Sequence, residues 1–220
     1  MENAVGPPIT KRSLQNVVYG RLHAAILNGR IKPGTKLNIS ELAEELNVSA
    51  VPVREALRQL EAEGCVSFQP NKKVVINQLS EEELNDIYMV MLPMEELALE
   101  RCFDKIEDSG YLALQGIIDE MTRIGVSKEW INLNWRFHTQ IHEIAGSPRL
   151  LNILKVLRSN IIPYLHLSIL DEARTNQANQ EHLEIFEALK SQKKEKAKAI
   201  LHRHLENGQK TISRILSQIQ

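Results

Sequence analysis

Two short apolar runs on either side of a basic tip constrain the fold of this chain more than any other feature. The runs are Cys65–Phe68 and Val74–Asn77, and the tip between them reads Gln-Pro-Asn-Lys-Lys. Short runs of this kind, separated by turn-forming residues, are typical of a β-hairpin. The other periodic stretches of the chain carry apolar residues at helical spacing. We therefore expect a mainly α protein with one small β element.

Three helical patterns precede the predicted hairpin. The first covers residues 13–28, and the second begins at Asn38, which forms a capping-box pattern with Glu41. The third begins after Ser49, a suitable N-cap, and has Pro52 in its first turn, where a missing N–H costs little. Three helices followed by a hairpin predict a winged helix-turn-helix. In that fold the third helix enters the major groove of DNA and contacts bases near its N-terminus.

The candidate DNA-contacting residues lie on the predicted third helix, near the start of the second helix and at the tip of the wing. Arg54 and Arg58 are four residues apart and share an outward face of the third helix. Arginine can pair with a guanine edge or a phosphate, and lysines on a wing suit phosphates or the minor groove. The predicted DNA-binding residues are Ser40, Ser49, Ala50, Val51, Pro52, Arg54, Arg58, Asn71, Lys72 and Lys73.

The charge of the chain is unevenly divided. Residues 1–78 contain ten lysines and arginines against seven acidic residues, a net charge of +3. The remaining residues contain 17 against 21, a net charge of −4, so the whole chain carries −1. The basic excess lies where DNA binding requires it. A small helical domain with solvated basic side chains is the alternative interpretation of the same residues.

Two motifs of the N-terminal third resemble the GntR family of bacterial repressors and activators. Residues 29–34 read G-R-I-K-P-G, and residues 52–64 read P-V-R-E-A-L-R-Q-L-E-A-E-G. The resemblance covers most of residues 14–76 and implies a DNA-binding transcription regulator. Relatives are homodimers, so the resemblance also implies a near-palindromic double-stranded operator.

Three positions depart from the family pattern. The family usually has arginine where this chain has Ser40 and Ala50, and glycine in the wing where it has Lys73. The two arginine positions commonly touch DNA in the family. We therefore expect an operator that differs from the family's common sequence, or a greater dependence on phosphate contacts. Val51 could pack on a thymine methyl group.

The C-terminal two-thirds of the chain are predicted to be helical throughout. Ser80 and Glu83 form a capping box that opens a helix reaching about Asp104, and Pro93 predicts a kink inside it. Further helical patterns cover residues 108–125, 128–145, 148–170, 174–191 and 194–218. Short polar breaks between them favour an antiparallel all-helical bundle. We expect residues 1–78 to form the winged helix and residues 79–220 to form the bundle, which would bind an effector and dimerise.

Several histidines lie on different predicted helices of the bundle. His138 and His142 are four apart on one helix, with Asn134 one turn before His138, while His182 and His204 lie on the last two helices. Facing helices can bring such side chains together as a metal site. Scattered histidines are more often surface or core residues, so both interpretations stay open on the residues alone.

The segments around these histidines resemble the FCD ligand-binding domain of the GntR family. They include N-W-R-F-H at residues 134–138 and E-H-L at residues 181–183, and the likeness spans roughly residues 80–215. Many members hold a divalent metal with one aspartate and three histidines. By position the ligands here are His138, His182, His204 and, in place of the aspartate, Asn134. A carboxamide is neutral, so zinc, nickel or manganese would be held more weakly.

The resemblance leaves two interpretations of the effector site open. An anionic effector could complete the coordination of a weakly held metal, or a metal-free set of histidines could hydrogen-bond the effector. Many relatives carry an arginine near the position of Met91, suited to a carboxylate. Met91 cannot take that role, whereas Arg158 could, with a surface arginine as the alternative. Effector binding would shift the population of bundle conformations and so change DNA affinity.

Other functional classes find less support in the sequence. A metal-dependent enzyme fused to a DNA-binding module would need catalytic motifs, and neither a phosphate loop nor an H-E-x-x-H pattern occurs. An effector-independent DNA-binding protein would not need so large a bundle. The chain has two cysteines, no signal-type apolar run at its N-terminus, and no window near the roughly 18 apolar residues of a membrane span. We therefore expect a cytoplasmic protein without membrane contact and without enzymatic activity.

Overall fold

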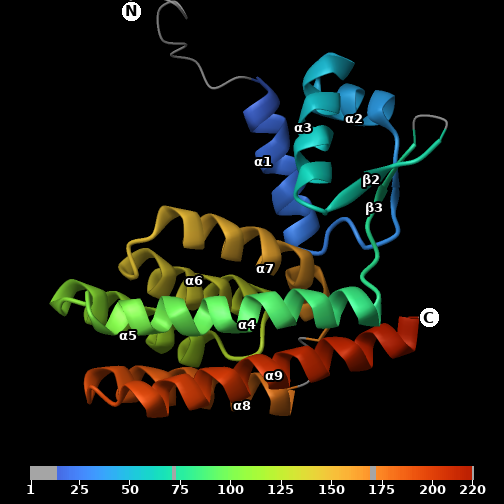
Figure 1. Ribbon diagram of the computed structural model, residues 1–220. Helices are drawn as coiled ribbons and strands as arrows, with labels where there is room; N and C mark the ends of the chain where they lie inside the picture. The colour runs from blue at the N-terminus through green and yellow to red at the C-terminus, as the bar shows by residue number, and fades with distance from the viewer. Residues whose placement is uncertain (1–13, 71–72, 169–171, 220) are drawn as a thin grey trace, which may run out of the picture. The chain divides into compact units, whose positions relative to one another are not determined.

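The computed structural model describes residues 14–70, 73–168 and 172–219 (Figure 1). The chain divides into two compact units, Met1–Gln78 and Leu79–Gln220.

The first unit is a winged helix-turn-helix. Its elements are α1 (Leu14–Leu27), β1 (Lys36–Leu37), α2 (Ile39–Leu46), α3 (Ala50–Ala62), β2 (Val66–Phe68) and β3 (Val74–Ile76). The strands form an antiparallel sheet in the order β1-β3-β2, so the hairpin strand β3 lies in the middle. Apolar faces of α1 and α3 pack on each other and on the sheet through Val18, Leu22, Leu57, Leu60 and Val74, among others. The predicted fold class is confirmed.

Local signals in the first unit account for most helix ends. Asn38 caps α2 by accepting a hydrogen bond from the backbone N–H of Ser40, and its own amide donates to Glu41 at 2.9 Å. Ser49 occupies the N-cap position of α3, as predicted, but its side chain makes no capping hydrogen bond. Gly64 ends that helix with a φ of +75°, a conformation that glycine adopts without strain. Strand β1 was not predicted, because two residues carry no recognisable periodicity.

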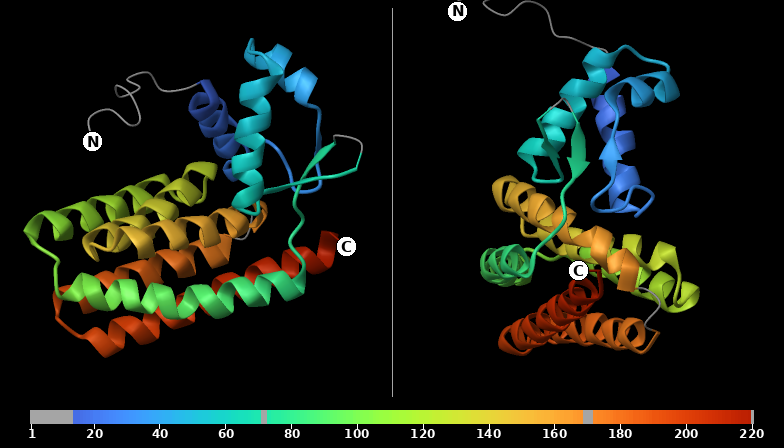
Figure 2. Two further views of the ribbon diagram at one scale, coloured as in Figure 1. Left: turned by 45° about the horizontal axis from the view of Figure 1, so that its top comes forward. Right: turned by 90° about the vertical axis from the view of Figure 1, so that its right-hand side faces the viewer.

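The second unit is an all-helical bundle (Figure 2). Its elements are α4 (Glu81–Phe103), α5 (Asp108–Ile124), α6 (Lys128–Ile144), α7 (Pro148–Ser168), α8 (Glu172–Lys190) and α9 (Lys194–Ile219). Both bonds of the predicted capping box between Ser80 and Glu83 are present at the start of α4. That helix continues through Pro93 to Phe103.

Four helices of the bundle, α4, α6, α7 and α9, pack against one another. The helices α5 and α8 pack outside them, with α5 against α6 and α8 against α9. Figures 1 and 2 show α4 and α9 running side by side, with α8 beneath α9. The interior is mostly apolar, but several charged and polar side chains are fully buried in it. Burying such groups is costly unless they are paired, so they mark the place to look for function.

Within the described ranges, no helix is long and apolar enough to cross a membrane.

Candidate functional sites

A surface hollow in the first unit brings together four of the predicted DNA-binding residues. Ser40 lies at the start of α2, Ala50 and Arg54 lie in the first turns of α3, and Lys73 lies at the tip of the wing, just before β3. All four are exposed. Lys36 of β1 lines the same hollow and adds a cation that the sequence did not single out. The hollow is therefore an open, basic surface that includes the N-terminal end of α3.

The other predicted DNA-binding residues have different surroundings. Ser49 is exposed and Val51 is 63% exposed, whereas Pro52 is buried. The guanidinium of Arg58 lies 4.1 Å from the ring centre of Phe68 in the wing and pairs with Glu61 at 2.8 Å. Arg58 thus joins α3 to β2. The remaining two, Asn71 and Lys72, lie outside the described residues.

A buried group of three imidazoles, His138, His182 and His204, lies inside the bundle. They come from α6, α8 and α9, and we refer to them as the histidine trio. One nitrogen from each ring lies within 4.8 Å of the others, and the Nε2 atoms of His138 and His204 are 3.3 Å apart. Neither ring nitrogen of His182 has a hydrogen-bond partner among the described residues. Unsatisfied buried nitrogens that converge in this way can serve as metal ligands.

The surroundings of the trio favour the neutral form of its rings. Burial lowers the pKa of all three rings, and the positive charge of Arg158 lowers it further. For His204 the hydrogen bond and charge of Glu181 oppose this effect without cancelling it. A metal ion requires imidazoles with a free lone pair, so neutral rings are the form that can bind one.

The carboxylate of Glu181 fixes the ring of His204. Its Oε2 accepts from Nδ1 of His204 at 2.8 Å and from Arg174 at 3.1 Å, while Oε1 accepts from Asn207 and Gln177. Burial raises the pKa of Glu181, but these partners outweigh it and lower that pKa to about 2. Because an ionised carboxylate only accepts, Nδ1 of His204 carries the proton and its Nε2 is left as a lone pair. Carboxylates that orient metal-binding histidines act in this way.

A second buried carboxylate, Glu95 of α4, lies near the trio beside His138. Its Oε1 accepts from Nε of Arg158, its Oε2 accepts from Nε2 of His142 at 2.8 Å, and the same Oε2 lies 3.9 Å from Nδ1 of His138. Burial raises the pKa of Glu95, but Arg158 and then His142 lower it to about 2. Each carboxylate therefore stays ionised because an arginine and a histidine share it.

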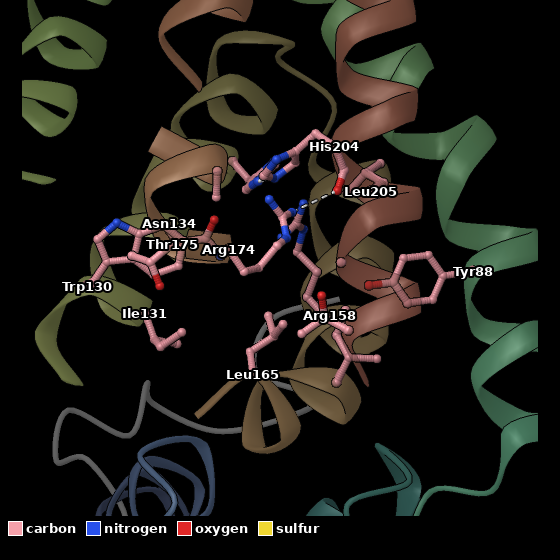
Figure 3. A pocket seen from close by; sticks show the side chains of 15 residues that line it. Tyr88, Trp130, Ile131, Asn134, Arg158, Leu165, Arg174, Thr175, His204 and Leu205 are labelled. Carbon is pink, nitrogen blue, oxygen red and sulfur yellow. Dashed lines mark hydrogen bonds between the residues drawn. The ribbon is translucent and has the colours of Figure 1, made fainter. Parts of the chain in front are cut away.

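A small cavity of about 50 Å³ opens beside the trio. Arg158 and Arg174 point toward its middle, below His204, with Trp130 on one side and Tyr88 on the other (Figure 3). Asn134, His138 and His204 also line it. Nη2 of Arg158 is buried and has no hydrogen-bond partner among the residues that the structure describes. The cavity thus presents cationic donors, a carboxamide and imidazoles to whatever it binds.

Most of the residues predicted for this site converge there. Arg158 is only 3% exposed, which overturns the alternative of a surface arginine. Asn134 lines the cavity, whereas Met91 is fully buried in α4 and does not line it. His182 contributes to the trio but is not among the lining residues.

Sequence reasoning missed three charged residues of the site, Glu95, Glu181 and Arg174. A usable signal existed for Glu95, because it falls on the same helical face as Tyr88, Met91 and Ala98, all of them buried. A carboxylate within such an apolar face indicates a buried charge that needs partners.

Comparisons with known proteins agree over most of the chain. A model of the gntR family of bacterial regulatory proteins matches residues 14–76, and a model of the FCD domain matches residues 86–207. The chain is 28% identical over 204 residues to the uncharacterized HTH-type transcriptional regulator YdhC of Bacillus subtilis (strain 168), covering 91% of each chain.

Two regulators of Escherichia coli (strain K12) are also similar. The HTH-type transcriptional regulator McbR is 28% identical over 174 residues, covering 76% of this chain and 78% of McbR. The HTH-type transcriptional repressor RspR is 22% identical over 202 residues, covering 90% and 88%. The solved structure of McbR superposes with a TM-score of 0.82 at 24% identity, over 96% of this chain and 100% of the McbR chain, and so has the same fold.

Proposed function

Because this chain belongs to the GntR family of bacterial transcriptional regulators and carries an FCD domain, we propose that a small molecule bound in the bundle controls its affinity for an operator. The family consists of DNA-binding regulators and not of enzymes, as the sequence predicted. The observation that carries the proposal is the buried histidine trio beside a cavity that two arginines line. Burying so many ionisable groups in one place is characteristic of a binding site.

The surface hollow of the winged helix is the proposed operator interface. Arg54 and Ala50 occupy the end of α3 that reads bases in this fold, and Lys73 and Lys36 suit phosphates. Ser40 and Ala50 replace arginines of the family pattern, so base readout rests on fewer side chains, Arg54 first among them. The proposed operator is a double-stranded, near-palindromic site.

A divalent metal fits the histidine trio. The donors are three neutral imidazoles, of which His182 lacks partners for both nitrogens within the described part of the chain and His204 is oriented by Glu181. Nitrogen ligands of this kind suit zinc and nickel, and manganese less strongly. Asn134 would contribute only a carbonyl oxygen, so the protein itself would supply no anionic ligand in contact with the metal. When bound, the ion would act as an anchor for an anionic group of the effector.

The arginines favour an anionic effector with or without a metal. Nη2 of Arg158 has no hydrogen-bond partner among the described residues, and Arg158 and Arg174 both line the cavity (Figure 3). A carboxylate placed there would receive charge-assisted hydrogen bonds. If no metal is bound, the neutral imidazoles remain as hydrogen-bonding partners for the same effector.

A homodimer is the proposed assembly, and α4 offers a surface for it. Val90 and Leu97 are 40% and 48% exposed, and with Pro93 they lie at helical spacing along one face. Exposed apolar stripes of this kind are typical of interfaces. Val90→Asp combined with Leu97→Asp should halve the mass measured by sedimentation equilibrium. An unchanged mass would place the interface elsewhere or remove it.

The metal part of the proposal is tested by elemental analysis of protein purified without chelators and then supplied with zinc, nickel and manganese. Near-stoichiometric metal in the wild type, lost in His138→Ala, supports the site. His202→Ala is the matched control, because His202 is a half-exposed histidine of α9 that pairs with Glu96 outside the trio. No metal in the wild type would leave a metal-free polar pocket.

The regulatory part is tested on a duplex selected from random DNA by the protein itself. Operator affinity is measured by fluorescence anisotropy with and without zinc and a panel of small carboxylates. Because coupling is reciprocal, an effector that changes DNA affinity must bind with an affinity that DNA changes by the same factor. If operator affinity stays constant with every ligand shown to bind, the protein is an effector-independent DNA-binding protein.

A further inference from the structure

We propose that Glu95 is a positioning residue for the metal: it favours the form of His138 in which Nδ1 carries the proton and Nε2 is free to bind the ion. The inference rests on the proposed function, because it takes the histidine trio as a metal site. Glu95 is 1% exposed and contacts His138 from α4, a helix that contributes no member of the trio.

The proton positions of two rings follow from their partners. The ionised Glu181 only accepts, so Nδ1 of His204 is the donor in that 2.8 Å bond. A neutral His204 then has a bare lone pair at Nε2. His138 Nε2 lies 3.3 Å from that atom, and a hydrogen bond between the two rings requires His138 to donate through Nε2. Its Nδ1 is therefore without a proton in the metal-free protein.

In this arrangement two hydrogen-bond acceptors, Nδ1 of His138 and Oε2 of Glu95, face each other without a proton between them. The lone pair of His138 Nδ1 lies 3.9 Å from Oε2 of the ionised Glu95 and has no hydrogen-bond partner among the described residues. A buried acceptor without a donor is destabilising, and a nearby negative charge adds to the effect. In the metal-free site, Nε2 of His138 therefore has a hydrogen-bond partner, whereas its Nδ1 has none within the described ranges and faces a negative charge.

Metal binding at Nε2 reverses the situation. The Nε2 proton must leave that atom, and the neutral ring carries its single proton on Nδ1 instead. Nδ1–H then faces the ionised carboxylate of Glu95, whose Oε2 lies 3.9 Å away, and this attraction becomes a charge-assisted hydrogen bond when ring and carboxylate move closer, as in carboxylates that orient metal-bound histidines. The ring gains no net charge, because its proton only changes position. The same carboxylate therefore destabilises the metal-free form and stabilises the metal-bound one.

Two other side chains of the bundle hold the carboxylate of Glu95 near His138. Arg158 binds its Oε1 and His142 binds its Oε2, so the carboxylate stays ionised and near the ring of His138. Arg158 also lines the cavity proposed for the effector. Glu95 is thus the group through which metal at the trio and an anion at Arg158 act on each other.

The first experiment reads the ring forms directly in the wild-type protein. Long-range ¹H–¹⁵N spectra of ¹⁵N-histidine-labelled full-length protein distinguish protonated, bare and metal-bound nitrogens, and the signals missing in His138→Gln assign that ring. We expect an Nε2–H form of His138 without zinc and an Nδ1–H form with zinc on Nε2. An Nδ1–H form already present without zinc, or zinc on Nδ1, would overturn the inference without depending on any variant at Glu95.

The second experiment measures zinc affinity by competition with a chromophoric chelator. Glu95→Gln removes the ionised acceptor and offers an amide N–H to the bare Nδ1 of His138, so it should stabilise the metal-free ring form. We expect zinc binding to weaken about 10- to 100-fold. Glu96→Gln is the matched control, because Glu96 also accepts from a histidine, His202 at 2.8 Å, but on the surface. It should leave the affinity unchanged.

The outcomes separate this inference from the metal proposal itself. Zinc bound equally well by wild type, Glu95→Gln and Glu96→Gln would overturn the role of Glu95 and leave the metal site intact. Zinc bound by none of them would overturn both. If Glu95→Gln does not fold, as judged by circular dichroism, the wild-type spectra decide the question.

Discussion

The arginines of the two units show opposite relations to their surroundings. Arg54 of the winged helix is exposed and makes no ion pair with any described residue. Arg158 of the bundle is buried and is bound to Glu95, which is itself bound to His142. An exposed charge without a partner contributes little to the stability of the fold. A buried charge that is paired inside the bundle stabilises the folded structure. The comparison predicts that removing an unpaired cation of the first unit changes binding without changing stability, and that removing a buried, paired charge of the second unit changes both.

The largest effect is expected for Glu95→Ala. It leaves Arg158 buried without its counter-ion, and breaking a buried pair from one side costs about 3–5 kcal/mol. The free energy of unfolding, measured in urea, should fall by that amount. Glu96→Ala, one residue along the same helix and partly exposed, should change it by less than about 0.5 kcal/mol. A loss below about 1 kcal/mol in Glu95→Ala would show that water reaches Arg158 and would break the contrast between the units.

A smaller effect, and of the other kind, is expected for Arg54→Ala. Operator affinity should fall about 10- to 100-fold, because an arginine paired with a base edge contributes roughly 1–3 kcal/mol. The free energy of unfolding should stay within about 0.5 kcal/mol of wild type, since no partner is left unpaired. Arg21→Ala, an exposed arginine of α1, is the control in anisotropy measurements on the selected duplex. Equal losses in both variants would mean that only net charge matters.

Arg58 tests whether the contrast holds for every arginine of the winged helix. It stacks on Phe68 and pairs with Glu61, so it has partners although its side chain is 61% exposed. Arg58→Ala should lower the free energy of unfolding by about 0.5–1 kcal/mol through loss of the stacking contact. It should weaken DNA binding less than Arg54→Ala does. A stronger effect on DNA than that of Arg54→Ala would make Arg58 a direct reader of the operator.

The two units also differ in how far sequence could describe them. Helical spacing, the capping pair of Ser80 and Glu83, and the turn at Gly64 predicted the helices of both units, because these signals are local. Strand β1 escaped because its pairing with β3 depends on residues almost forty positions away and leaves no periodic pattern in two residues.

The bundle site was predicted only in part for a related reason. The trio came from a family resemblance, since on spacing alone scattered surface or core histidines were the more common interpretation. Glu95, Glu181 and Arg174 were missed because charged residues on amphipathic helices usually face solvent. Their burial follows from which helices pack together, and only the three-dimensional arrangement places Glu95 beside His142, which is 47 residues away.

The smallest effect is expected at the wing, for Lys73→Ala. Lys73 is exposed, lines the surface hollow with Arg54, and stands where the family usually has glycine. If it contacts a phosphate, the slope of the logarithm of operator affinity against the logarithm of salt concentration should become shallower by about 0.9, with no change in sequence preference. Arg54→Ala should lower affinity most for the preferred sequence, so comparing the two variants on selected and random duplexes separates positioning from readout. A Lys73→Ala variant that relaxes sequence preference and keeps the salt slope would show that the wing contacts bases. The wing would then take over part of the base readout that arginines provide in the family at the positions of Ser40 and Ala50.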